Sequence, residues 1–132
     1  MVPKVVLDTN VLISALGWAG PERAVYELCL EGYLQLWSSH ALLAEFVRVL
    51  GYPKFRFPSE HKTQFLEDLL KLTNFVENPI NVRVVPEDPD DDRVVGCAVA
   101  VAADFIITGD RHLFTLGRYG QTRIVTAAEY IG

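Results

Sequence analysis

The stretch Val5-Val6-Leu7-Asp8-Thr9-Asn10-Val11-Leu12-Ile13 places an aspartate between two apolar runs. The first run predicts a buried strand, and the second predicts a helix that begins after a small polar turn. Asp8 would therefore stand at the carboxyl edge of a sheet, where open α/β sheets bind their ligands. The arrangement recurs near the other end of the chain, where the apolar residues 105–108 are followed by a glycine and Asp110. Two strand-end aspartates in one small domain suggest a shared acidic site, and such a site suits a hard metal ion.

The composition is that of one globular domain. The chain has 132 residues, of which 50% are hydrophobic and 22% are charged, so we expect a single domain over residues 1–132. No apolar run approaches the roughly 20 residues of a membrane span, and no apolar signal segment precedes the first strand. We therefore expect a cytoplasmic protein without a membrane segment. Cys29 and Cys97 lack motif spacing, which favours buried free thiols over a disulfide.

The charge is negative and unevenly placed. The formal net charge is -5, and five of the acids fall within residues 87–92. An acidic protein repels nucleic acid unless cations neutralise part of its surface. Any nucleic-acid function of this chain therefore needs bound cations.

Strand and helix patterns alternate along the chain, which predicts an α/β fold. We expect a three-layer α/β/α sandwich around a central, mostly parallel sheet of about four or five strands. The expected strands are residues 4–7, 34–37, 82–85, 105–108 and 123–125. The expected helices are residues 10–16, 21–31, 39–50, 59–74, 92–102 and 112–116, with a last turn after residue 126. The candidate helix N-caps are Ser38 or Ser39, Ser59 and Thr126.

Acidic side chains recur at one topological position. Asp8 and Asp110 follow strands, Asp91 or Asp92 opens a helix after a strand, and Glu45 lies in the helix after the second strand. Each acid alone also fits an ordinary role, as an Asx-turn residue, a helix N-cap or a solvated helix residue. Glu45 lies off the centre of its helix's apolar stripe, so it leans toward the sheet edge or faces water. Charges gathered at one edge repel each other, and a divalent cation compensates that repulsion.

Other chemistries fit the sequence poorly. Asp88, Asp90 and Asp92 have the spacing that opens a calcium loop, but Arg93 and Val99 stand where that motif needs Gly and Glu. The three histidines have no paired spacing with the cysteines, which disfavours a zinc site. No phosphate-binding glycine loop is present in the sequence.

Four segments of the chain, in order, resemble the PIN domain, a family of metal-dependent ribonucleases. They are residues 6–14, 43–46, 88–95 and 103–110. The chain looks most like the branch of toxin components of toxin–antitoxin pairs, the VapC-like ribonucleases. One departure is Ala102, where such chains often have the glycine that ends the helix.

The resemblance implies a set of site residues and a cofactor. The metal-binding and catalytic acids would be Asp8, Glu45, Asp91 and Asp110, with Asp92 as the alternative or additional ligand beside Asp91. The cofactor would be Mg²⁺ or Mn²⁺, as one or two ions. The hydroxyl and amide side chains that support these acids would be those of Thr9, Asn10 and Thr108.

The resemblance also implies a reaction and partners. We expect metal-assisted hydrolysis of RNA phosphodiester bonds by an endoribonuclease, which would be a toxin with a cognate antitoxin and would form a homodimer or a larger assembly. The candidate RNA phosphate contacts are Lys54, Arg56, Arg93 and Arg111. The side chains that would stack on unpaired bases or pack in the core are Tyr52, Phe55 and Phe57.

Two other classes of protein compete with this interpretation. The first is a non-catalytic α/β module that binds protein or RNA and keeps a metal-binding acidic edge. The second is another Mg²⁺-dependent phosphotransfer protein. A phosphatase with a nucleophilic aspartate would need a second Asp where Asn10 stands, and a receiver domain would need a lysine where Gly109-Asp110 stands. Both phosphotransfer alternatives are disfavoured by these residues.

Overall fold

A six-stranded sheet forms the centre of the computed structural model, which describes residues 1–80 and 89–132. The strands are β1 (Lys4–Leu7), β2 (Gln35–Ser38), β3 (Asn74–Phe75), β4 (Phe105–Ile107), β5 (Arg118–Tyr119) and β6 (Thr122–Val125). Their order across the sheet is β3-β2-β1-β4-β6-β5. Every neighbouring pair is parallel except β5 and β6, which are antiparallel. The predicted mostly parallel sheet is therefore confirmed.

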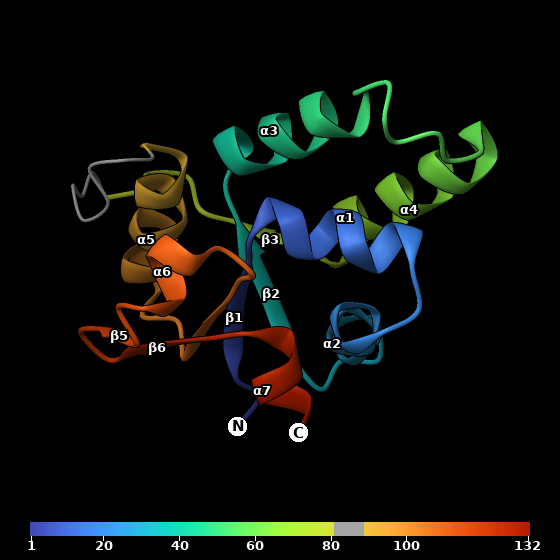
Figure 1. The fold of residues 1–132 in the computed structure, drawn as a ribbon. Coiled ribbons are helices and arrows are strands. Elements are labelled where there is room, and N and C mark those ends of the chain that lie inside the picture. The colour runs from blue at the N-terminus through green and yellow to red at the C-terminus, as the bar shows by residue number, and fades with distance from the viewer. Residues whose placement is uncertain (81–88) are drawn as a thin grey trace.

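Helices cover both faces of this sheet. They are α1 (Thr9–Gly17), α2 (Pro21–Leu30), α3 (His40–Leu50), α4 (Ser59–Leu72), α5 (Pro89–Val101), α6 (Arg111–Phe114) and α7 (Ala127–Ile131). Figure 1 shows α5 and α6 on one side of the sheet and α1, α2 and α7 on the other, which gives the three predicted layers. In the part of the chain that the structure describes, no helix is long and apolar enough to cross a membrane.

The two central strands are apolar on both faces because both faces are covered. Val5, Leu7 and Ile107 are buried in the cluster that includes the apolar residues of α1 and α2. Val6 and Ile106 point the other way and are buried with the apolar residues of α5. This alternation anchors β1 and β4 from both sides, so the residues that follow these strands start from fixed positions.

Cys29 and Cys97 are free and buried, as predicted, one in each of the two clusters. Burial raises the pKa of each thiol from 9.0 to about 12. Thiols with so high a pKa stay protonated near neutral pH and react poorly as nucleophiles. Neither cysteine is therefore a candidate for covalent chemistry.

Two short strands were missing from the sequence prediction. The predicted helix over residues 59–74 ends at Leu72, because Asn74 and Phe75 pair with Trp37 and Ser38 of β2 to form β3. At the opposite edge, β5 pairs with β6 through two residues. Four of the expected strands lie in the described part of the chain, and with these two additions the sheet has six strands. The expected strand at residues 82–85 lies outside the described residues.

Some predicted helix starts were right and others were wrong. The Ser39 hydroxyl accepts a hydrogen bond from the Leu42 amide and caps α3, and Thr126 forms a capping box at α7. Ser59 does not cap α4, because it is already the first helical residue and Pro58 holds the cap position. The helix α5 begins at Pro89, so the expected N-cap positions at residues 91 and 92 lie inside the helix.

Ala102, directly after α5, has a φ of 51°. This left-handed conformation costs about 1–2 kcal/mol for a residue with a Cβ atom and is nearly free for glycine. The turn is closed by a hydrogen bond from the Ala103 amide to the Ala98 carbonyl, 2.9 Å long. The backbone at this helix end therefore has the shape for which a glycine is suited, although the chain carries an alanine.

Candidate active site

The two strand-end aspartates lie at one edge of the sheet. Strands β1 and β4 are parallel neighbours, with Leu7 opposite Ile107, so their carboxyl ends coincide. Asp8 follows β1 directly and its exposed fraction is 6%. Asp110 follows β4 after two residues and is partly exposed. Asp8 and Asp110 therefore lie at the same edge of the sheet, as predicted, because the two strands before them are parallel neighbours.

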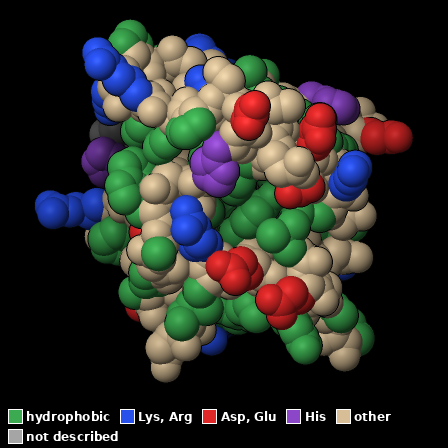
Figure 2. All heavy atoms as spheres, turned by 90° about the vertical axis from the view of Figure 1, so that its right-hand side faces the viewer, with side chains coloured by type: hydrophobic (Ala, Val, Ile, Leu, Met, Phe, Trp, Pro, Cys, Tyr) green, Lys and Arg blue, Asp and Glu red, His purple; other side chains and the backbone are tan. Residues whose placement is uncertain are grey.

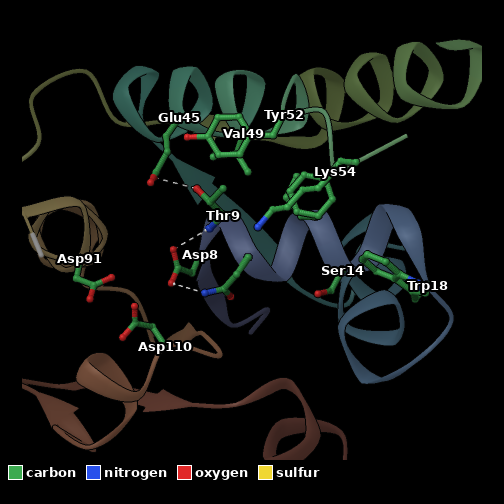
Figure 3. Close-up of a pocket in the computed structure, with 13 residues that line it drawn as sticks. Asp8, Thr9, Ser14, Trp18, Glu45, Val49, Tyr52, Lys54, Asp91 and Asp110 are labelled. Atoms are coloured by element: carbon green, nitrogen blue, oxygen red, sulfur yellow. Dashed lines mark hydrogen bonds between the residues drawn. The ribbon is translucent and has the colours of Figure 1, made fainter. Parts of the chain in front are cut away.

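Asp8 is held by hydrogen bonds to both of its carboxylate oxygens. Its Oδ1 accepts from the Thr9 amide at 2.8 Å. Its Oδ2 accepts from the Asn10 side-chain amide at 3.2 Å and from the Thr108 hydroxyl at 2.7 Å. Figure 3 shows the first two of these bonds at the start of α1. Hydrogen bonds of this kind stabilise the ionised carboxylate and fix its orientation.

Two side chains join the ends of β1 and β4. The Thr108 hydroxyl, which donates to Asp8, also accepts from the Asp110 amide at 3.0 Å. Asn10 donates to Asp8 and accepts from the Gly109 amide at 3.2 Å. All three predicted supporting residues, Thr9, Asn10 and Thr108, thus contact the acids directly. The turn after β4 is tied to the first turn of α1 by these bridges.

Glu45 leans toward the sheet edge instead of facing water. It projects from α3, and its Oε2 accepts a hydrogen bond of 3.0 Å from the Thr9 hydroxyl. The Thr9 amide also donates to Asp8, so Thr9 is hydrogen-bonded to both acids. The sequence left both orientations of Glu45 open, and this contact decides between them.

Asp91 projects from the first turn of α5 and is buried, with 3% exposed. Figure 3 shows its carboxylate facing that of Asp110, with Asp8 beside them. Four acids from four parts of the chain line one pocket of about 350 Å³, namely Asp8, Glu45, Asp91 and Asp110. Asp92 is not among the residues that line this pocket. The geometry therefore places Asp91, and not Asp92, beside the other three acids.

The far end of the pocket is aromatic. Trp18, Tyr52 and Phe55 line it together with Lys54, whose Nζ lies 5.1 Å from the centre of the Phe55 ring. Figure 3 shows the acids on one side of the pocket and Trp18 on the opposite side. The pocket therefore runs from a charged end to an apolar end.

The remaining predicted contacts lie elsewhere. Arg56, Arg93 and Arg111 are exposed, and none of the three lines the pocket. Phe57 packs beneath the loop, with its ring 5.8 Å from those of both Phe55 and Trp18. Lys54 is thus the one predicted phosphate contact that the structure places in the pocket.

One residue of the site was missed from the sequence. Asp91, Asp110 and His112 each offer a possible metal-ligand atom, and these atoms lie within 4.8 Å of one another. The Nδ1 atom of His112 lies 3.6 Å from Oδ1 of Asp110. The sequence prediction considered the histidines only as zinc ligands together with the cysteines. The useful signal was that His112 follows Asp110 by two residues at the start of a predicted helix.

The donor set fits a divalent metal ion. Four carboxylates in one pocket supply the hard oxygen ligands that Mg²⁺ and Mn²⁺ accept. The imidazole of His112 adds a nitrogen at one side of this set. These acids stand at the carboxyl edge of a parallel sheet, which is where open α/β folds bind their ligands.

Comparison with known families identifies the chain more closely. A family model described as the PIN domain matches residues 4–112, and the chain belongs to this family. The predicted resemblance is therefore confirmed. No curated protein sequence matches the chain.

Solved structures share the fold at low sequence identity. The chain resembles VapBC2 from Rickettsia felis, a structure bound to a DNA fragment from the promoter, with 15% identity and a TM-score of 0.59 over 92% of this chain and 96% of that one. It also resembles PAE2754 from Pyrobaculum aerophilum, with 17% identity and a TM-score of 0.58 over 94% of this chain and 92% of that one. Both likenesses support the same sheet-and-helix arrangement.

Proposed function

We propose that this protein is an endoribonuclease that depends on a divalent metal ion and hydrolyses RNA phosphodiester bonds. The observation that carries this proposal is the convergence of Asp8, Glu45, Asp91 and Asp110 on one pocket in a PIN-domain chain. A pocket lined by four acids repels a polyanion such as RNA electrostatically unless cations are bound there. Bound Mg²⁺ or Mn²⁺, as one or two ions, removes that conflict.

Each acid has a task that follows from its surroundings. Asp8 is oriented by three hydrogen bonds, so it offers a fixed ligand at the centre of the site. Glu45 is positioned through Thr9, and Asp91 and Asp110 close the opposite side of the pocket. When bound, the metal supplies activation of water and neutralisation of phosphate charge. The protein's contribution is to hold its ligands in place before the substrate arrives.

The substrate that best fits the pocket is single-stranded RNA. Tyr52 and Phe55 offer ring faces on which an unpaired base can stack, and Lys54 offers a positive charge between the rings and the acids. Bases within a duplex do not expose their faces, whereas unpaired bases do. A phosphate at the acidic end with its neighbouring base at the aromatic end would use the whole length of the pocket.

The same proposal includes an antitoxin partner, because the chain shares its fold with VapBC2, whose crystal structure is bound to a DNA fragment from the promoter. A groove of about 190 Å³ between α1, α2 and α4 is lined by apolar and aromatic side chains and by both acidic and basic ones, among them Tyr26, Leu30, Phe65, Glu27, Asp68, Arg23 and His61. Figure 2 shows this side of the molecule, with hydrophobic side chains bordered by acidic, basic and histidine side chains. An amphipathic segment of an antitoxin would fit such a surface, and a homodimer or a larger assembly in the cytoplasm is expected.

The test is cleavage of single-stranded RNA by the purified protein with Mg²⁺ or Mn²⁺, beside EDTA and the Asp8→Asn variant. Asp104→Asn is a matched control, since Asp104 lies at the start of β4 on the opposite edge of the sheet. We expect cleavage by the native protein and by Asp104→Asn, and none with EDTA or Asp8→Asn. Metal binding without any cleavage would favour the alternative, a non-catalytic module with a metal-binding acidic edge.

A further inference from the structure

We infer that His112 is a metal ligand, and that with Asp91 and Asp110 it forms a mixed nitrogen and oxygen position that prefers first-row transition ions to Mg²⁺. This inference rests on the proposed metal site and adds to it the kind of ion that one side of the site selects. It concerns a residue outside the four acids that the family resemblance implies.

The three ligand atoms are already close together. Oxygens of Asp91 and Asp110 and a ring nitrogen of His112 lie within 4.8 Å of one another. Ligands at roughly 2.0–2.3 Å from one ion lie up to about 4–5 Å apart, so small side-chain rotations are enough to bring all three onto one ion. Asp91 comes from α5, whereas Asp110 is the N-cap residue of α6 and His112 lies in the first turn of α6, so the cluster joins two helices.

The ordinary explanation for His112 is a hydrogen bond to its neighbour, and the geometry does not support it. The Nδ1 atom of His112 lies 3.6 Å from Oδ1 of Asp110, which is longer than a hydrogen bond. That same oxygen accepts a bond of 2.8 Å from the His112 backbone amide. The imidazole therefore lies within ion-pair distance of the carboxylate but is not hydrogen-bonded to it, and two ligands of one shared ion can have the same separation.

The backbone around the cluster is fixed. The Asp110 amide donates to the Thr108 hydroxyl, and Leu113, the α6 residue next to His112, is fully buried. His112 itself is 55% exposed in its side chain, so it can turn toward an ion without disturbing the core. A fixed backbone and an accessible imidazole are what a ligand at the mouth of a site needs.

The ligand chemistry distinguishes the two sides of the acidic end. Around Asp8 and Glu45 the neighbouring side chains offer oxygen and amide groups, which suit Mg²⁺. Imidazole nitrogen is a favourable ligand for first-row transition ions, whereas Mg²⁺ prefers oxygen and gives up its water reluctantly. A protein with His112 in place should therefore bind Mn²⁺ or Co²⁺ more tightly, relative to Mg²⁺, than the same protein without it.

Pulsed electron paramagnetic resonance on the Mn²⁺-loaded protein tests the inference without any measurement of activity. We expect a nitrogen-14 coupling from a bound imidazole in the native protein, its loss in His112→Ala, and its retention in the control His40→Ala. His40 is a suitable control because it is exposed and stacks on Phe75, with ring centres 5.0 Å apart, and is not among the residues lining the acidic pocket. Thermal unfolding of both variants checks that each one folds.

Calorimetric titration supplies the second readout. We expect His112→Ala to weaken Mn²⁺ binding by at least about 10-fold, which is the lower end of the loss seen when even an outer-shell partner is removed. Its Mg²⁺ affinity should change by no more than about 2-fold, since Mg²⁺ gains little from a nitrogen ligand. Equal losses for Mn²⁺ and Mg²⁺ would overturn the claim of selectivity.

The possible failures separate the two proposals. Native protein that binds Mn²⁺ with no nitrogen coupling, or a coupling that persists in His112→Ala, overturns the role of His112 and leaves the nuclease proposal standing. Native protein that binds no Mn²⁺ overturns both, because the carboxylates themselves would then hold no ion.

Discussion

The two ends of the pocket are built in different ways. At the acidic end, Asp8 is buried and bound by three donors, and Thr108 and Asn10 tie the ends of two central strands together. At the aromatic end, Tyr52 and Lys54 are exposed on the two sides of Pro53. The first end is rigid because the sheet and its hydrogen bonds determine it. The second can adapt, and it suits recognition of a flexible strand better than chemistry.

The largest expected effect tests which acids belong to the rigid end. Asp91→Asn should lower kcat/KM for RNA by at least about 100-fold, because loss of a direct ligand exceeds the 10–100-fold typical of outer-shell partners. Asp92→Asn is the matched control, since the two residues are adjacent and only Asp91 lines the pocket. It should stay within about a factor of 3 of the native rate, as substitutions away from the chemistry usually do. The reverse order would place Asp92 in the site.

The next effect tests the bridge between the strand ends. Thr108→Val removes a hydroxyl that donates to buried Asp8 and accepts from the Asp110 amide. A hydrogen bond to a charged group contributes about 1.5–3 kcal/mol, so both thermal stability and metal affinity should fall, the latter by about 10–100-fold. Thr108→Ser keeps the hydroxyl and should restore most of the affinity. If the valine variant binds metal like the native protein, the acidic end does not depend on this bridge.

A smaller effect tests the aromatic end. Tyr52→Ala should raise KM for single-stranded RNA by about 10-fold with little change in kcat, because stacking on one base contributes about 1–3 kcal/mol to binding. Tyr52→Phe keeps the ring and should behave like the native protein. Tyr33→Ala controls for loss of an exposed tyrosine, since Tyr33 is 65% exposed and is not among the residues lining the pocket. A fall in kcat alone would mean that this end takes part in chemistry.

Gly17 offers a way to move the aromatic end without changing an aromatic residue. A Cβ atom at Gly17 would lie 2.7 Å from the Phe57 ring, so Gly17→Ala must displace that ring. Phe57 contacts both Phe55 and Trp18, and we expect KM to rise by about 3- to 10-fold as the packing shifts, a loss of about 1 kcal/mol. Metal affinity, measured by titration, should not change. A loss of metal binding would show that the two ends are not independent.

The sequence was sufficient for the features that repeat along the chain. The apolar runs before Asp8 and Asp110 predicted two buried strands, and the alternation of elements predicted the parallel sheet that brings these acids together. Two-residue strands such as β3 have no periodic pattern, so their number could not be derived. Their existence depends on a neighbouring strand that has an open edge.

The rest of the site depends on helix position, which the sequence leaves undecided. Asp91 and Asp92 differ by one residue, and the choice depends on where α5 begins. The direction of Glu45 depends on a hydroxyl from another helix, 36 residues away in sequence. His112 was not predicted because one of its partners, Asp91, lies on α5, although the other, Asp110, is only two residues away. Each of these features depends on how separate helices and strands are placed relative to one another, and the sequence pattern within one element does not determine that placement.

The smallest expected effect concerns a place remote from both ends of the pocket. Ala102→Gly should raise the free energy of unfolding by about 0.5–1 kcal/mol, because relief of a left-handed alanine exceeds the extra entropy that glycine has in the unfolded chain. The melting temperature should rise by a few degrees, on the order of 2–4 °C. RNA cleavage should be unchanged, since Asp91 lies at the other end of α5. Higher stability with altered cleavage would mean that the backbone conformation at Ala102 affects the position of Asp91 at the other end of α5. The geometry of the acidic end would then depend on the placement of α5 as well as on the hydrogen bonds around Asp8.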